Sequence, residues 1–377
     1  MTTLQKKYIT CARCVMDETA KDIKFNKDGV CNYCQEFENT AELIKNGKII
    51  DDSLNVDSLV CSIKSAGKNR KYDCIVGVSG GVDSSWALVK AVELGLRPLA
   101  VHMDNGWNSE LAQNNIHQLV KKLNVDLYTH VVDWYEYKNL MLSFFNADVV
   151  DIELLMDNAM LATNYQQANK FGVKYILSGQ NQSTEGMNMP ESWSWFKFDK
   201  RNIISLGRSV GQKLKTFPSI GTFNYIYYEH VKKIKWLPFI DYFNFNKDEA
   251  IKLLVDNYNY KPYQYKHYES IFTRFYQGYI LPEKFNIDKR KLHLSTLIIT
   301  GQIDRGEAIN ILAQKPYKDR DYRQDKKYFL KKMSWSEEDF NNYISRPEKS
   351  HEKFNSEKKL WDFIFLSKAS RYIRGRL

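Results

Sequence analysis

The residues of this chain best suited to chemistry lie in the string Ser-Gly-Gly-Val-Asp-Ser at residues 79–84. An apolar, β-branched run precedes the string and a helical apolar pattern follows it to about Leu94, which predicts a strand, a tight turn and a helix. Two adjacent glycines let the backbone approach a ligand closely, and free N–H groups at a helix start attract anions. Hydroxyl groups are added by Ser79, Ser84 and Ser85. We predict that the turn binds phosphate or pyrophosphate; the alternative is an ordinary capped strand-to-helix turn.

The string lacks the spacing of a Walker loop. It resembles instead the PP-loop of ATP pyrophosphatases, enzymes that split ATP into AMP and pyrophosphate. The resemblance implies that ATP and Mg²⁺ bind here and that the backbone near Gly80 and Gly81, with the serine hydroxyls, holds the phosphates. Asp83 is expected to help position Mg²⁺ and pyrophosphate, and Asp83 and Ser84 are expected to serve catalysis.

Four of the six cysteines form two pairs with the spacing C-x-x-C, separated by sixteen residues: Cys11, Cys14, Cys31 and Cys34. Each pair aims two sulfurs at one metal, and two pairs complete a tetrahedron, as in a structural zinc ribbon. The alternative is four unconnected thiols. Cys74 lies in the first apolar strand and is expected to be a small core residue.

Apolar runs predict strands at residues 72–78, 97–103, 126–132, 173–177 and 236–243. The helix after residues 79–84 ends near Leu94, and further helical patterns cover 109–123, 151–170 and 247–256. This β-α-β alternation implies an α/β fold with a parallel sheet and right-handed crossovers. Ligands of such sheets bind beyond the carboxyl ends of the strands, where Met103 and Asp104 are placed for the adenosine half of ATP.

The predicted fourth strand leads into a polar loop at residues 178–186 at the same edge. We assign Gly179 and Gln180 to cofactor binding, and Asn181 and Glu185 to the substrate. Glu185 is also a candidate for holding Mg²⁺ and for catalysis; the alternative is a solvated polar connection.

The net charge is +10 and the pI is about 9.0. This balance suits anionic partners, although a solvated basic surface would give the same count. No run of 18 apolar residues occurs, and residues 1–8 lack the apolar core of a signal peptide. We therefore expect a cytoplasmic protein without membrane insertion.

Several segments together resemble the N-acetyl sugar amidotransferase family of bacterial surface-polysaccharide enzymes, which are similar to WbpG. They are the cysteine strings at 11–17 and 29–34, the PP-loop, the triplet at 184–186, and the charged strings at 267–277 and 284–295. The resemblance implies an adenine nucleotide alpha hydrolase-like PP-loop domain at 71–245. A zinc ribbon at 1–36, a connector at 37–70 and a mainly helical region at 246–377 complete the expected organisation.

The family resemblance also implies the reaction, in which an acetamido group of a nucleotide-linked sugar becomes an acetamidino group in lipopolysaccharide, O-antigen or related glycan biosynthesis. AMP is transferred to the amide oxygen, and ammonia then displaces it. In this family the ammonia comes from a separate glutaminase with a cyclase-like partner, and no glutaminase domain is evident in this sequence.

The C-terminal strings are dense in charge and also contain Glu269, Asp288 and His293. Residues expected to bind the nucleotide diphosphate or a sugar carboxylate are His267, Arg274, Lys284 and Arg290. The alternative is a charged helix face with surface ion pairs.

Two other classes of function compete with this interpretation. A tRNA-thiolating PP-loop enzyme would use the same adenylation and would suit a basic chain, but such enzymes commonly carry further cysteines in the catalytic domain. No cysteine follows Cys74 here, so we expect no nucleic-acid partner. A non-enzymatic zinc-ribbon binding module would leave the phosphate loop unexplained.

Overall fold

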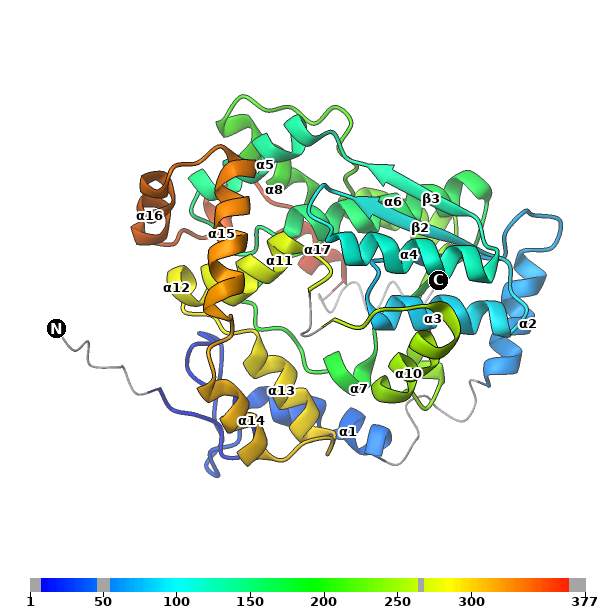
Figure 1. Cartoon of the computed structure of the whole chain (residues 1–377), viewed down its shortest axis with the longest axis horizontal. Helices are drawn as coiled ribbons and strands as arrows, with labels where there is room; N and C mark the ends of the chain where they lie inside the picture. The colour runs from blue at the N-terminus through cyan, green and yellow to red at the C-terminus, as the bar shows by residue number, and fades with distance from the viewer. Residues whose placement is uncertain (1–7, 46–54, 264–267, 366–377) are drawn as a thin grey trace.

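The computed structural model describes residues 8–45, 55–263 and 268–365 and is organised around one parallel sheet (Figure 1). The strands run in the spatial order β3-β2-β1-β4-β5, and every neighbouring pair is parallel. Their bounds are Cys74–Gly77 for β1, Pro98–Asp104 for β2, Leu127–Val131 for β3, Tyr175–Ser178 for β4 and Lys235–Pro238 for β5. The predicted α/β class and parallel sheet are thus confirmed.

The central strands β1, β2 and β4 are buried on both faces of the sheet. Their alternate residues pack against different helices. Ile75, Leu99 and Ile176 pack in one cluster with helix α6 (Leu154–Phe171). Val76 and Leu177 belong to the opposite cluster, with α3 (Val82–Glu93), α4 (Glu110–Leu123) and α10 (Lys247–Tyr258). The apolar residues on the two sides of these strands therefore pack against two layers of helices.

The last predicted strand is shorter in the structure than expected. Strand β5 ends at Pro238, and residues Phe239–Tyr242 form a 3-10 turn, η2, instead of continuing to 243. Proline has no N–H to donate to the next ladder bond, which accounts for the early end.

Several helices lie in stretches without a predicted element. One of them, helix α5 (Trp134–Asn146), begins after Asp133, whose carboxylate accepts the N–H of Glu136 at 2.8 Å as a helix cap.

The sheet layer extends beyond the predicted boundaries at 70 and 245. Helix α10 packs on α3, and Trp86 of α3 meets the rings of Phe243 and Phe245 edge-on at 5.3 and 5.1 Å. Helix α2 (Val56–Ala66), from the predicted connector, adds Val60 and Ile63 to the same core.

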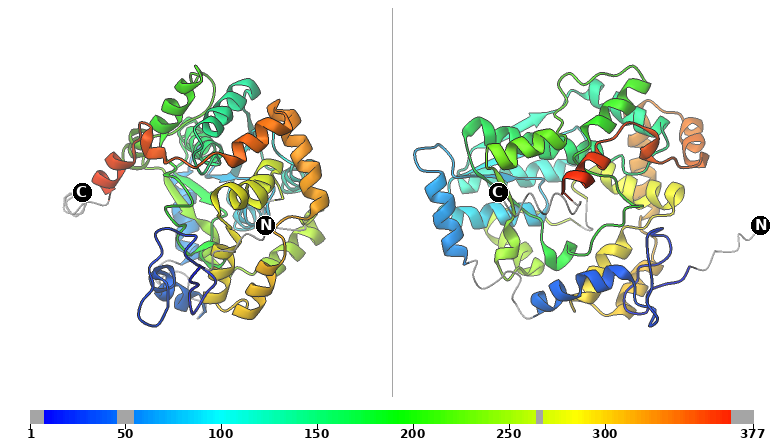
Figure 2. Two further views of the ribbon diagram at one scale, coloured as in Figure 1. Left: turned by 90° about the vertical axis from the view of Figure 1, so that its left-hand side faces the viewer. Right: turned by 180° about the vertical axis from the view of Figure 1, so that it is seen from behind.

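The rest of the described chain is mainly helical (Figures 1 and 2). The N-terminal and middle elements are α1 (Asn32–Lys45), α7 (Gln182–Glu185), α8 (Lys200–Ser209), α9 (Thr222–Ile226) and the π-turn η1 (Tyr227–Val231). A continuous helical stretch follows, made of α11 (Ile271–Phe275), the π-turn η3 (Tyr276–Ile280) and α12 (Leu281–Phe285). The last elements are α13 (Arg290–Ile299), α14 (Arg305–Ala313), α15 (Asp319–Met333), α16 (Glu337–Ser345), η4 (His351–Lys353) and α17 (Lys358–Phe365).

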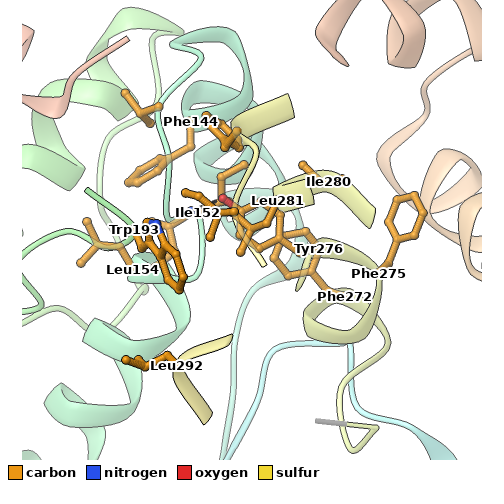
Figure 3. Close-up of a cluster of buried hydrophobic side chains, with 14 of the residues drawn as sticks. Phe144, Ile152, Leu154, Trp193, Phe272, Phe275, Tyr276, Ile280, Leu281 and Leu292 are labelled. Atoms are coloured by element: carbon orange, nitrogen blue, oxygen red, sulfur yellow. Dashed lines mark hydrogen bonds between the residues drawn. The ribbon is translucent and has the colours of Figure 1, made fainter. Parts of the chain in front are cut away.

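One large core joins this helical region to the N-terminal cysteines and to α5. Figure 3 shows its centre, where Phe272 and Tyr276 lie beside Ile152 and Leu281. The hydroxyl of Tyr276 accepts the N–H of Ile152 at 3.3 Å, so its one polar atom is satisfied inside the core. All four predicted regions therefore contribute residues to one apolar core.

Among the helices of the described ranges, none has both the length and the apolar character required to span a bilayer.

Candidate nucleotide-binding site and metal centre

The predicted phosphate loop lies where the strand order of the sheet reverses. Strand β1 has β2 on one side and β4 on the other, so the loops that follow β1 and β4 leave the sheet as neighbours. They touch closely: a Cβ placed on Gly179 would lie 2.7 Å from Ser84 N and 2.9 Å from Ser84 Cα. The structure thus brings together two loops that the sequence assigned separately to cofactor binding.

The first turn of α3 presents its N–H groups without a side-chain cap. The N-cap position is Gly81, which has extended backbone angles and no side chain to accept these donors. Uncapped N–H groups at the start of a twelve-residue helix favour an anion by hydrogen bonding and by the helix dipole. This arrangement agrees with the predicted phosphate site and disfavours the ordinary capped turn.

The backbone of Gly80 is held in position by two tyrosines. Its φ is +85°, and a Cβ there would lie 2.8 Å from the carbonyl oxygen of Ala112 in α4. The hydroxyls of Tyr260 and Tyr263 donate to the Gly80 carbonyl at 3.1 and 3.0 Å. Only glycine fits this position, and the two phenols fix the orientation of the Gly80–Gly81 peptide.

The predicted serine ligands divide into two groups. Ser79 and Ser84 lie in the loop, with their Oγ atoms 3.2 Å apart, and Gly81 donates its N–H to Ser79 Oγ at 3.3 Å. Ser85 is only 1% exposed and lies on the buried side of α3. Its Oγ is buried and has no hydrogen-bond partner among the described residues, so the assignment of Ser85 to cofactor binding stays a prediction.

The end of β2 is tied to the end of β1 by a histidine. One ring nitrogen of His102 lies 2.8 Å from the carbonyl oxygen of Val78, and the other lies 3.0 Å from Asn108. Asp104 accepts the N–H of Gly106 at 2.9 Å and thereby shapes the turn after β2. Met103 packs partly against the large core. Both predicted adenosine residues thus lie at the carboxyl edge, one strand away from the phosphate loop.

The loop after β4 is ordered by Asn181, which caps the short helix α7. Its Oδ1 accepts the N–H of Thr184 at 2.9 Å and the hydroxyl of Ser183 at 2.8 Å. Its Nδ2 is buried and has no acceptor among the described residues, which leaves a donor for a ligand. Gln180 and Glu185 are exposed on this loop.

The predicted C-terminal ligands serve the architecture instead. Arg274 makes two 2.6 Å hydrogen bonds to Asp325, and its guanidinium lies 4.5 Å from the ring of Tyr268. Arg290 pairs with Asp288 at 2.7 Å and donates to backbone carbonyl oxygens. Because Nε and Nη2 of Arg274 and all three nitrogens of Arg290 bond inside the protein, the prediction that these side chains bind substrate is corrected to the alternative of ion pairs.

Lys284 requires the same correction. Its side chain is 0% exposed, and its ammonium donates to Asp148 at 3.2 Å and to the carbonyl oxygens of Tyr343 and Arg346 at 2.6 and 2.7 Å. Burial is the main cause that lowers the pKa of Lys284. Its three donors are satisfied inside the protein. His267, the fourth predicted ligand, lies outside the described residues.

A residue to which sequence reasoning gave no role in the site lies beside the phosphate loop. A Cβ on Gly81 would be 3.4 Å from Oε1 of Glu269. The carbonyl oxygen of Glu269 accepts the N–H of Ser109 at 2.9 Å, and Asn108 and Ser270 form an isolated antiparallel β-bridge. In the sequence, Glu269 stands out only as part of a charged string. It comes close to Gly81 because its segment packs against the loop after β2.

The four paired cysteines meet as predicted. Their sulfurs lie within 4.8 Å of one another, with Cys11–Cys34 at 3.9 Å and Cys14–Cys31 at 3.8 Å. Four sulfurs bound tetrahedrally at about 2.3 Å would be about 3.8 Å apart. The N–H of Cys31 also points to Cys11 Sγ at 3.3 Å, as thiolate ligands require. The residues therefore fit a tetrahedral metal ion with no open position.

This cysteine centre rests on α13 and α14. Val15 donates to Ser295 at 3.3 Å, Lys291 pairs with Asp17 at 2.5 Å, and Arg305 donates to the carbonyl oxygen of Cys14 at 3.0 Å. Arg305 also donates to the carbonyl of Cys11 at 3.2 Å. The metal-binding loop is thus fixed to the C-terminal helices.

Helix α13 and the turn after it also hold α7. His293 lies 3.0 Å from the carbonyl oxygen of Thr184, and Gln302 donates to that of Ser183 at 2.7 Å. On the other side of α7, Phe37 of α1 packs against Gly186. A Cβ added to Gly186 would lie 2.4 Å from the Phe37 ring. The cysteine centre and α7 are therefore supported by one set of contacts.

The fold and the site define the class of protein: a PP-loop-type α/β protein, with the phosphate loop at the switch point of a parallel sheet. Residues 269–368 match the family described as LPS biosynthesis protein WbpG-like, C-terminal domain. The C-terminal region of the chain is thus similar to that domain of WbpG-like LPS biosynthesis proteins, which confirms this part of the resemblance found in the sequence. No curated protein matches the chain.

Similar solved structures include the NMN synthetase from Francisella tularensis, at 15% identity and a TM-score of 0.28, covering 63% of this chain and 98% of that one. The NH3-dependent NAD synthetase from Campylobacter jejuni has the same identity and TM-score and covers 58% and 84%. A predicted tRNA methyltransferase subunit from Methanocaldococcus jannaschii has 13% identity and a TM-score of 0.28, covering 48% and 75%. The strand order and the loops of this chain themselves define its fold.

The contact between Gly179 and α3 generates a first prediction. Gly179→Ala should push the two loops apart, because the added carbon would lie under 3.0 Å from backbone atoms of residues 83 and 84. We expect ATP affinity, measured by isothermal titration calorimetry, to fall about tenfold or more, which corresponds to about 1.4 kcal/mol. Gly306→Ala, on helix α14, is the matched control and should leave ATP affinity unchanged. Wild-type affinity in Gly179→Ala would contradict the assignment.

A second prediction concerns the cysteine centre. Protein purified without chelators should contain one zinc ion per chain by elemental analysis, and Cys14→Ser should lose it. Because the centre supports α13 and α7, metal loss should lower the melting temperature and expose residues 8–45 to proteolysis. Cys61→Ser, at an exposed thiol, should change neither property. Iron, or no metal at all, would refute the zinc assignment.

A third prediction concerns pH. Asp241 accepts the N–H of Gln182 at 2.7 Å, and burial, the main cause, raises its pKa from 3.8 to about 6. The folded state thus retains a proton that the unfolded chain loses, so this contribution to stability is full below about pH 4 and is lost as the pH rises through 6.

Asp241→Asn should remove this dependence and raise the free energy of unfolding above pH 7 by roughly 1–3 kcal/mol. Denaturant melts between pH 4 and 8 measure it, with Asp256→Asn, at an exposed site on α10, as the control. A variant whose pH profile parallels that of the wild type would contradict the assigned pKa.

Proposed function

We propose that this protein is an ATP-dependent amidotransferase that converts an acetamido group of a nucleotide-linked sugar to an acetamidino group. One observation supports this above all: Glu269, the first residue of the WbpG-like domain, lies against Gly81 of the phosphate loop. The domain that marks the family and the loop that suits ATP thus border one site. The product would enter lipopolysaccharide or O-antigen biosynthesis in the cytoplasm.

The reaction needs activation because an amide carbon is a poor electrophile and its oxygen is a poor leaving group. In the proposed mechanism the amide oxygen attacks the α-phosphorus of ATP and pyrophosphate leaves. Ammonia then attacks the carbon, AMP departs with the oxygen, and loss of a proton gives the amidine. The N–H groups of the first α3 turn and the hydroxyls of Ser79 and Ser84 would bind the pyrophosphate portion, where charge develops. Asp83 and Glu185 would hold Mg²⁺.

The ammonia would come from a separate glutaminase with a cyclase-like partner. The two cysteines outside the metal centre do not suit a glutaminase nucleophile. Cys74 is fully buried in β1, where burial raises its pKa above the usual range. Cys61 lies on α2, far from the carboxyl ends of the strands (Figure 1). The chain's own thiols therefore give no route to ammonia.

A fourth prediction tests the reaction. The purified chain, given ATP, Mg²⁺, ammonium and a panel of N-acetylated sugar nucleotides, should form AMP, pyrophosphate and a product about one dalton lighter than the substrate. The product should be cationic, because an amidine stays protonated near neutral pH much as a guanidinium does. Glutamine alone should fail, and a glutaminase encoded nearby should restore activity with glutamine.

Mass spectrometry and AMP detection provide the measurements. Gly81→Val should abolish activity, whereas Cys61→Ser should retain it. ADP as the product would refute the loop assignment. Thiolation of tRNA with a sulfur donor, without turnover of any sugar nucleotide, would establish the competing function.

A further inference from the structure

A hollow of about 580 Å³ lies beyond the carboxyl ends of β2 and β3, beside the predicted ATP site. The turn after β2 forms its floor through Asp104, Asn105 and Gly106, and α5 contributes Trp134. Its far wall is α15, with Tyr328 and Lys331. Figure 1 shows the ends of β2 and β3 facing the side on which α15 stands. The volume is typical of a small-molecule site.

Its aromatic lining is held in place by a lysine. The ammonium of Lys332 lies 4.4 Å from the ring of Trp134, 4.9 Å from Trp107 and 5.4 Å from Tyr328, and it donates to the carbonyl oxygen of Gly106. Trp107 is fully buried and meets Trp134 edge-on at 5.6 Å. Lys332 thus joins α15 to the β2 turn, while Tyr328 stays 39% exposed.

We propose that this hollow binds the base and diphosphate of the sugar nucleotide. Trp134 and Tyr328 line the hollow with aromatic surface that suits a nucleobase, while Lys332 lies over part of both rings. The exposed ammonium of Lys331 at the rim suits a diphosphate. The inference rests on the proposed function and adds the place where the second substrate is recognised.

The position favours the sugar nucleotide over ATP. The phosphate loop and Gly179 lie beyond β1 and β4, whereas the hollow lies beyond β2 and β3. Strands are about 4.8 Å apart, so the hollow is roughly 5–10 Å along the edge from the phosphate loop. A sugar attached to a diphosphate can cover that distance and bring its acetamido group to the α-phosphorus. The wall formed by α15 also belongs to the WbpG-like domain.

The experiment measures binding apart from catalysis. UDP, CDP, GDP and dTDP are titrated separately into the full-length protein without ATP, by calorimetry. At least one should bind, and Tyr328→Leu should weaken that binding about tenfold or more, in line with the loss of base stacking. Lys331→Ala should weaken it as well. The matched control is Tyr135→Leu, on α5, where the tyrosine is 79% exposed and does not line the hollow.

Thermal melts accompany each variant, and Tyr328→Leu is the decisive one because its ring is partly exposed. In turnover assays its KM for the sugar nucleotide should rise about tenfold while that for ATP stays within about twofold. If no diphosphate binds the wild type, or if Tyr328→Leu binds as the wild type does, the proposal is wrong. An equal loss of ATP affinity would assign the hollow to adenine and would also overturn it.

The outcomes separate this inference from the proposed reaction. Diphosphate binding that depends on Tyr328, without amidination of any sugar nucleotide, would support the hollow and reject the reaction. Amidine formation with an unchanged sugar-nucleotide KM in Tyr328→Leu would support the reaction and reject the hollow.

Discussion

The first turn of α3 is the constraint on which the site depends. Its N–H groups have no side-chain cap because the N-cap residue is Gly81. A second glycine, Gly179, is required in the loop after β4 because a side chain there would collide with the backbone of this turn. A helix start left open in this way is stabilised when an anion occupies it. The surrounding contacts, from the phenols on Gly80 to the cap at Asn181, keep the two loops in a geometry that a phosphate chain can use.

The cysteine centre and the helices next to it support that geometry by packing. The cysteine centre is fixed to α13 and α14, and α13 with the turn after it holds the carbonyl groups of α7. Phe37 closes α7 from the opposite side. A metal ion bound by four cysteines would therefore stabilise an active-site loop through packing alone. This gives the metal a structural part in the proposed reaction without any chemistry at the metal.

The basic residues of the C-terminal region illustrate how burial decides the use of a charge. Arg274 and Lys284 are largely or wholly enclosed, and their donors go to Asp325, Asp148 and backbone oxygens. A buried ammonium without partners would be very unfavourable, so such groups are retained only where they are satisfied internally. Lys331, exposed at the rim of the hollow, is free of that requirement and suits an anionic ligand better.

The sequence alone determined the parallel α/β fold, the strand, turn and helix around residues 79–84, and the cysteine centre. Each of these follows from local spacing: apolar alternation sets the strands, Gly80 and Gly81 mark the turn, and paired cysteines set the sulfur geometry. Tertiary structure alone decided that Ser85 faces the core, that Arg274 and Lys284 are internal, and that Glu269 reaches Gly81. The reason is physical: a side chain's partners far along the chain depend on how helices dock, and residue type and spacing carry no information about that docking. The hollow between β2 and α15 likewise exists only because segments more than two hundred residues apart pack together.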